Sequence, residues 1–319
     1  MGKYVARRLL LIIPTLLILT MLVFGIMRVL PGDVATRMLS DEAGALSMKQ
    51  FTVDALRAKL HLDRPLYLQY LGWLWDLGRG DLGESLFTGR PVRDEILQRL
   101  PITFQIALMA QILSLGIGIP VGILSAIRQN SWVDLLLRFW SIFFLAAPSF
   151  WLALLFILLA ALQFNWLPPV GYHPFFEDPR SNLLQLIWPS VILSLGGLAT
   201  IARMTRSTML EVMREDYIRT ARAKGLKEQI VIIRHALKNA MIPVVTLAGL
   251  GFAGLMGGTV ILEQIFAIPG LGSFFINAIN FRDYTIVQGA VVVFAVIFML
   301  VNLLVDVMYG WLDPRISYG

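Results

Sequence analysis

The sequence predicts an all-α integral membrane protein, and two observations, its composition and the grouping of its apolar residues, support this fold class. Of its 319 residues, 57% are hydrophobic and only 15% are charged, whereas about 25% are charged in an ordinary soluble domain. The apolar residues gather in blocks of about 20, the length a helix needs to cross roughly 30 Å of hydrocarbon. Cysteine is absent, which excludes a disulfide framework, a thiolate metal site and a cysteine nucleophile.

Six apolar blocks are long enough to cross a bilayer as helices that satisfy their own backbone hydrogen bonds. The predicted spans are Leu9–Leu30, Ile102–Ile127, Leu135–Leu162, Leu183–Ile201, Met241–Leu262 and Ile286–Met308. Pro14, Pro120 and Pro148 fall inside them, where neighbouring helices can accommodate a kink. The first block could instead be a signal peptide, but it is long for one and no A-x-A site follows. We therefore expect a retained first span.

The distribution of Lys and Arg predicts the orientation. The segment 202–240 carries nine basic and four acidic residues, whereas the loops 163–182 and 263–285 carry one arginine each. The positive-inside rule places 202–240, the loop 128–134 and both termini in the cytoplasm. Segment 31–100 and the two poorly charged loops then face outward. The net charge of +6 is explained by these membrane-flanking residues, so no nucleic-acid partner is expected.

Ionisable side chains are scarce within the predicted spans. Arg28, Arg138 and Asp306 lie within a few residues of span ends, where side chains can reach the interface. None lies near the middle of a span, although proton-coupled transporters usually place a relay there. The histidines fall in loops, which disfavours an intramembrane metal or hydrolase site. We expect the energy source to lie in another protein.

A glycine-rich stretch in the fifth span has two interpretations. Gly249-x-Gly251-x-x-Gly254 matches a nucleotide-binding pattern, but it lies within an apolar span and follows no strand. It is better explained as a face of small residues, which permits close helix packing or leaves room beside a pathway. The candidate residues for the pathway or for packing between permeases are Gly251, Gly254, Gly257 and Gly258. The chain contains no Walker A sequence.

The cytoplasmic segment 202–240 predicts a distinct short helix. Residues 203–213 are expected to extend the fourth span as a helix. Asp216 is a plausible N-cap of the next helix, and Gly225 stands where a left-handed residue ends one. This helix could anchor the protein to acidic lipid headgroups. Alternatively it is a rigid projection that docks into a groove of a partner.

These residues resemble a known family. Residues 216–225, followed by 235–243, resemble the EAA loop of ATP-binding-cassette importer permeases, and more narrowly that of the dipeptide/oligopeptide subfamily. Other signatures of that subfamily follow in order: Pro31-Gly32-Asp33, Leu62-Asp63-Arg64-Pro65, Tyr70-Leu71-Gly72-Trp73-Leu74, Gly80-Asp81-Leu82-Gly83-Glu84-Ser85, Pro269-Gly270-Leu271-Gly272, Arg282-Asp283-Tyr284, Gln288-Gly289, Asn302, Asp306, Tyr309-Gly310 and Asp313-Pro314-Arg315. The general EAA pattern has Glu and Ala where this chain has Arg219 and Thr220. Asp216 is the expected substitute for that Glu.

The resemblance implies a type I importer permease fold and a subunit without enzymatic activity or cofactor. It implies a heterodimer with a second homologous permease, two ATP-binding ATPase subunits, and an extracytoplasmic binding protein that delivers a peptide or similar solute. The expected location is the cytoplasmic (inner) membrane of a prokaryote. The residues expected to contact the ATPase are Asp216, Tyr217, Arg219, Thr220, Ala221, Arg222, Ala223, Lys224 and Gly225.

The expected organisation has four parts. They are a cytoplasmic end and first span (1–30), an extracytoplasmic domain (31–100), a five-span core (101–308) and a cytoplasmic tail (309–319). Within the outer domain, Phe51–Leu62 has a helical pattern and could contact the binding protein, cap the pore or simply pack. The alternative function is that of a secondary transporter or channel driven by an ion gradient.

Overall fold

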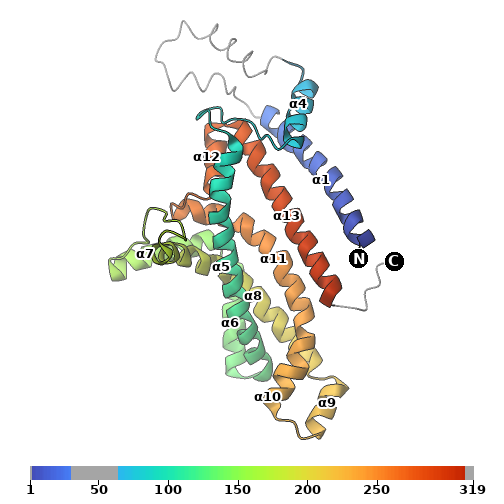
Figure 1. The fold of residues 1–319 in the computed structure, drawn as a ribbon. Helices are drawn as coiled ribbons and strands as arrows, with labels where there is room; N and C mark the ends of the chain where they lie inside the picture. The colour runs from blue at the N-terminus through green and yellow to red at the C-terminus, as the bar shows by residue number, and fades with distance from the viewer. Residues whose placement is uncertain (1, 30–63, 313–319) are drawn as a thin grey trace. The chain divides into compact units, whose positions relative to one another are not determined.

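A computed structural model describes residues 2–29 and 64–312, and these are helical over most of their length (Figure 1). The Phe51–Leu62 segment and several of the signature residues lie outside this part of the chain. The elements are α1 (Gly2–Val29), α4 (Leu66–Gly78), α5 (Val92–Ile127), α6 (Trp132–Ala146), α7 (Ser149–Phe164), α8 (Pro179–Val212), α9 (Asp216–Ala223), α10 (Glu228–Ile230), the π-helical η1 (Val231–Leu237), α11 (Lys238–Ile265), α12 (Leu271–Phe281) and α13 (Tyr284–Leu312). This confirms the prediction of an all-α chain.

Five helical segments in the described residues are long and apolar enough to cross a membrane. They are Arg8–Val29, Val92–Ile127, Pro179–Val212, Glu228–Ile265 and Tyr284–Val305. Each contains most of one predicted span, so five of the six predictions hold in position. The helices run further than the apolar blocks because polar residues continue them beyond the hydrocarbon, as α8 does through residues 203–212.

The third predicted span is not one continuous helix. α6 and α7 are bent by 104° at a short break around Pro148. The residue before a proline is driven away from helical angles, and Ala147 is accordingly extended, with ψ 125°. With 15 and 16 residues, these helices are about 22 Å and 24 Å long. Neither alone crosses hydrocarbon that is about 30 Å thick.

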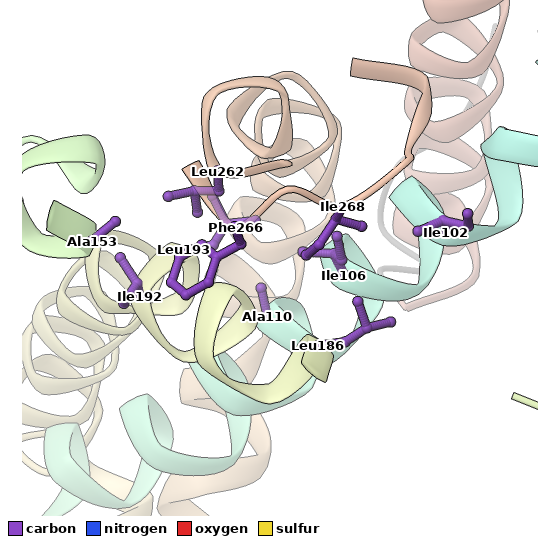
Figure 2. Packing of buried hydrophobic residues seen from close by; sticks show 10 residues of the cluster. All are labelled: Ile102, Ile106, Ala110, Ala153, Leu186, Ile192, Leu193, Leu262, Phe266 and Ile268. Carbon is purple, nitrogen blue, oxygen red and sulfur yellow. The ribbon is translucent and has the colours of Figure 1, made fainter. Parts of the chain in front are cut away.

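The chain divides into two compact units. The larger comprises Met1–Val5, Pro101–Ser273 and Phe298–Gly319. At its centre, α5, α7, α8 and α11 meet in one apolar cluster, in which Ile106 lies beside Ile268 and Leu193 beside Phe266 (Figure 2). Apolar burial drives helix association only weakly in lipid, so close packing has to supply much of the stabilisation.

Glycines provide that close packing between α5 and α8. A Cβ placed on Gly118 would lie 2.9 Å from the Leu198 carbonyl oxygen. One turn further along α5, a Cβ on Gly122 would lie 2.6 Å from Thr205. Only a residue without a side chain allows the backbones to approach this closely, so α5 and α8 are held in one register over two successive turns.

The smaller unit comprises Ala6–Leu100 and Phe274–Ile297. Within its described residues, α1 packs against α4 through Phe24, whose ring stacks on Trp73 at 6.1 Å between centroids. The Thr20 and Tyr70 hydroxyls are 3.1 Å apart. The tip of the following loop is pinned by a single antiparallel bridge between Glu84 and Pro91.

Candidate functional site

The short helix α9 forms where the sequence predicted it, but its N-cap is different. The Glu215 carbonyl oxygen accepts the amides of Ile218 at 3.1 Å and Arg219 at 3.3 Å, so Glu215 occupies the cap position. No side chain bonds to the N-terminal amides. The prediction that Asp216 is the N-cap is therefore wrong by one residue. Asp216 is the first helical residue, where its carboxylate still complements the positive end of the helix dipole.

The other end of α9 is closed as expected. Gly225 is left-handed, with φ +77°. Its amide bonds to the Arg222 carbonyl oxygen at 2.9 Å, and the Leu226 amide reaches back to the Ala221 carbonyl oxygen at 3.4 Å. This pair of bonds is the Schellman arrangement, which satisfies carbonyl groups that the last turn would leave free. The prediction for Gly225 is confirmed.

One face of α9 is buried against its own chain. Ile218 and Ala221, spaced by three residues, are the only buried residues in the helix. They enter an apolar cluster with the end of α5, the end of α8, η1 and the start of α11. The buried members of the cluster are Ala126, Met209, Ile218, Ala221, Val231, Ile232, Ala236 and Ala240. Ala221, expected to contact a partner, instead faces inward. Ile218, which was not among the residues expected to contact the ATPase, holds α9 against its own chain. Its spacing of three residues from Ala221 could have predicted that both lie on the buried face of the helix.

Polar side chains along the edges of α9 bond to the following segment. The Arg222 guanidinium donates from Nη2 to Glu228 Oε1 at 2.7 Å and from Nε to Oε2 at 3.2 Å. This bond to Glu228 raises the pKa of Arg222 further above its already high usual value. Asn239 Nδ2 donates to the Tyr217 hydroxyl at 2.7 Å. Exposed pairs of this kind contribute little stability, but they fix the rotation of α9 about its buried face.

The outer face of α9 is strongly polar. Arg219 donates to Asp216 at 3.2 Å within the helix. Thr220, Ala223 and Lys224 are exposed. With the exception of Ala221, every residue expected to contact a partner is thus at the surface of the chain.

The four candidate glycines of α11 are divided between two environments. Gly251, Gly254 and Gly257 recur every third residue on an exposed line, and a Cβ added to any of them would meet nothing within 4 Å. A Cβ on Gly258 would instead lie 2.9 Å from the Leu193 side chain of α8. The structure therefore brings three of the four together on one outward face, while Gly258 packs inside the chain.

Comparison with known proteins decides the family. The family described as "Binding-protein-dependent transport system inner membrane component" matches residues 118–318, and the family of the N-terminal part of such components matches residues 1–107. The chain belongs to this family of transport permeases. The putative peptide transport system permease protein of Brucella suis is 41% identical over 318 residues, which cover 100% of each chain. The dipeptide transport system permease protein DppB of Alkalihalophilus pseudofirmus is also 41% identical, over 338 residues and 100% of each chain.

A solved structure supports the fold. A chain of the MetNI methionine ABC transporter in inward-facing conformations is similar with a TM-score of 0.54. The identity is 16%, and the match covers 68% of this chain and 96% of the other. The permease is thus a multi-pass membrane protein with the type I importer fold.

The signature Pro269-Gly270-Leu271-Gly272 of the permease packs on a buried acid. Glu263, near the end of α11, is fully buried and accepts hydrogen bonds from the Thr103 hydroxyl at 2.7 Å and the Ser273 amide at 2.8 Å. A Cβ on Gly270 would lie 2.4 Å from this carboxylate, and one on Gly272 would lie 2.9 Å from it. Sequence reasoning did not single out Glu263. The two glycines that follow it, Gly270 and Gly272, could have indicated that a side chain packs closely against this turn.

A second signature is organised by Asp283. This residue accepts a bond from the Ser85 hydroxyl at 2.7 Å and one from the Leu86 amide at 3.0 Å. Its other oxygen accepts from the Ile286 amide at 3.2 Å and so caps the start of α13. Burial outweighs these bonds and raises the pKa of Asp283. The acid therefore stabilises the fold most when it is protonated, and this contribution fades as the pH rises through its folded-state pKa.

Proposed function

We propose that this permease is a pore-forming subunit of an ATP-binding-cassette importer, and that it moves peptides or a similar small solute. Relatives similar along their whole length are described as peptide and dipeptide permeases. The observation that carries the mechanism is α9, a short helix seated on its own chain by Ile218 and Ala221 with its polar face outward. We infer that this face docks on a separate ATPase subunit.

The construction of α9 suits the transmission of force. A helix of eight residues is too short to be stable by itself in water. Here its buried residues and the Arg222–Glu228 and Tyr217–Asn239 bonds hold it in one orientation. A partner that displaced α9 would therefore displace the ends of α5, α8 and α11, because they share one apolar cluster. ATP-driven closure of two ATPases could in this way switch the permease between inward- and outward-facing states.

The proposal extends to the orientation and the assembly that membership of this family implies. Segment 202–240 and both termini are cytoplasmic, and the segment 31–100 forms an extracytoplasmic domain. A second, homologous permease completes the pathway, two ATPases bind on the cytoplasmic side, and a binding protein delivers the solute from outside. The exposed line of Gly251, Gly254 and Gly257 supports a surface of α11 that faces the pathway or the partner permease. Cysteine accessibility that placed Gly251, Gly254 and Gly257 against lipid would rule this out.

Purification of the complex tests the energy source. The permease should co-purify with an ATPase subunit, and uptake of a labelled dipeptide should stop when ATP is depleted. Uptake should survive an uncoupler as long as ATP is maintained. A secondary transporter would show the opposite dependence, and a channel would respond to neither treatment.

Substitutions in α9 test the docking surface. A triple variant with Asp216→Lys, Arg222→Glu and Gly225→Val should insert in the membrane normally but lose ATP-driven uptake. A matched control is a charge reversal at the exposed Arg128, in the loop between α5 and α6 and outside the proposed surface. Wild-type uptake by the inserted triple variant would disprove the assignment. Because the chain contains no cysteine, a single cysteine at Thr220 could also be cross-linked to the ATPase in an otherwise native permease.

A further inference from the structure

A buried carboxylate joins the three helices α5, α6 and α8. Asp134, in the first turn of α6, is fully buried and accepts four hydrogen bonds. Arg206 of α8 donates two of them, from Nε to Oδ1 and from Nη2 to Oδ2, both at 2.8 Å. The Ser125 hydroxyl, near the end of α5, donates to Oδ1 at 2.5 Å. The Asn130 amide, in the intervening turn, donates to Oδ2 at 3.0 Å.

The geometry of this cluster fixes a register. A guanidinium that binds both oxygens of a carboxylate is directional, so the two groups cannot slide past each other without breaking the fork. Ser125 adds the end of α5 to the same carboxylate. The close glycine contacts of α5 with α8, at Gly118 and Gly122, lie along the same pair of helices. Polar directionality and steric contact thus both oppose movement of α8 relative to α5 and α6.

The cluster adjoins the seat of α9 on two helices. Ala126, which follows Ser125, belongs to the apolar cluster that buries Ile218. Met209, one turn after Arg206, belongs to it as well and is fully buried. In Figure 1, α9 lies at the end of the α8 and α11 helices, and α6 begins near that same end. A displacement of α9 therefore acts on α5 and α8, and the ion pair links α8 to α6.

We propose that Asp134 and Arg206 are positioning residues that make α5, α6 and α8 move as one block when α9 is displaced. This rests on the proposed docking of α9 to an ATPase. Without the pair, α8 would bend or slide against α6, and part of the displacement of α9 would be lost before it reached the spans. The requirement is for the fork geometry, because apolar side chains at both positions could fill the space without fixing a register.

Distance measurement tests the block directly in the assembled transporter. This chain has no native cysteine, so spin labels at Leu135 of α6 and Glu211 of α8, both exposed, report on these helices alone once the other subunits have been made cysteine-free. The wild type should give one narrow distance, and this distance should be the same without nucleotide and with ADP–vanadate. The single variants Asp134→Asn and Arg206→Lys should each show a second, longer distance between the labels in the ADP–vanadate state. Arg203→Lys, an exposed arginine on the preceding turn of α8, should leave the single distance intact.

A double replacement separates positioning from stability. Replacing a buried ion pair by apolar residues of similar size often preserves or raises stability, so Asp134→Leu with Arg206→Met should assemble in normal yield. It should nevertheless show the second distance, and transport per ATP hydrolysed should fall on the order of tenfold, within the range of known allosteric couplings. A single unchanged distance in this variant would overturn the proposal. So would a wild-type distance that differs between nucleotide states.

The two proposals fail in different ways. If no ATPase co-purifies with the wild type, the proposed function is wrong. If an ATPase co-purifies and the wild type transports, but the variants keep a single distance with ADP–vanadate, the proposed function stands and the block is refuted.

Discussion

Among the described residues of the larger unit, two acids are buried, and they are stabilised in opposite ways. Asp134 is neutralised by a guanidinium that binds both of its oxygens at 2.8 Å. Glu263 is held by neutral donors, the Thr103 hydroxyl and the Ser273 amide at the start of α12. Both side chains are fully buried. The first acid joins helices side by side, and the second joins the end of one helix to the beginning of another.

The difference indicates different tolerances to change. Removing one partner of a buried ion pair strongly destabilises the fold, because the remaining charge is buried without a counter-charge. An acid that is held by neutral donors depends instead on the room around it. Backbone amides can approach its carboxyl group only where no side chain stands in the way. Gly270 and Gly272 supply that space at Glu263. Near Asp134 the close glycines serve helix contact and do not touch the carboxylate.

The largest effect is expected from Arg206→Met. This substitution leaves Asp134 buried without its cation and should destabilise the fold by about 3–5 kcal/mol. Thermal unfolding of the purified complex, followed with Arg203→Met as the control, measures the effect. A loss no larger than that of the control would mean that the pair is not needed for the fold.

A smaller loss is expected from Gly270→Ala. Its Cβ would lie 2.4 Å from the Glu263 carboxylate, and forcing extra volume into a packed site costs about 1–3 kcal/mol. Gly116→Ala in α5 is the matched control, because its Cβ meets nothing within 4 Å and alanine favours a helix by up to about 1 kcal/mol. Equal unfolding temperatures for the two variants would contradict the packing of Gly270 on Glu263.

Thr103→Val tests the neutral donors themselves. The threonine hydroxyl donates to Glu263 and accepts the Leu271 amide at 2.8 Å. Valine has nearly the same shape but no hydroxyl, so the Glu263 carboxyl and the Leu271 amide each lose a hydrogen-bond partner. The fold should be destabilised by about 1–3 kcal/mol. Hydrogen exchange of the Leu271 amide should accelerate, whereas amides of α9 should not change. Unchanged exchange at Leu271 would show that another group satisfies it.

The smallest effect is expected from Ser125→Ala. Asp134 loses one hydroxyl but keeps the guanidinium and the Asn130 amide, so the loss should be about 0.5–1.5 kcal/mol. Comparing the unfolding free energies of Ser125→Ala and Thr103→Val sharpens the contrast between the acids. If Ser125→Ala proved the more damaging, the guanidinium would not be the main partner of Asp134.

Much of the fold could be predicted because local patterns determine it. Apolar blocks gave the long helices, and the left-handed glycine at Gly225 gave the end of α9. The sequence predicted only a kink at Pro148, and the structure has a full break between two helices. The cause is local, because a proline disfavours helical angles at the residue before it, here Ala147. Asp134 and Arg206 are separated by 72 residues, and no spacing rule joins them. The environment of Glu263 likewise depends on α5, which is distant in sequence.

The corner between α6 and α7 constrains how deep this part of the permease can lie. A right-angled bend interrupts the ladder of backbone bonds, and Pro148 has no amide hydrogen to offer. Carbonyl groups left open at such a corner cannot face acyl chains, because hydrocarbon contains nothing that would bond to them. The exposed side chains around it, including Phe150, would nevertheless avoid water. We therefore expect the corner to lie at the headgroup boundary or against a neighbouring subunit.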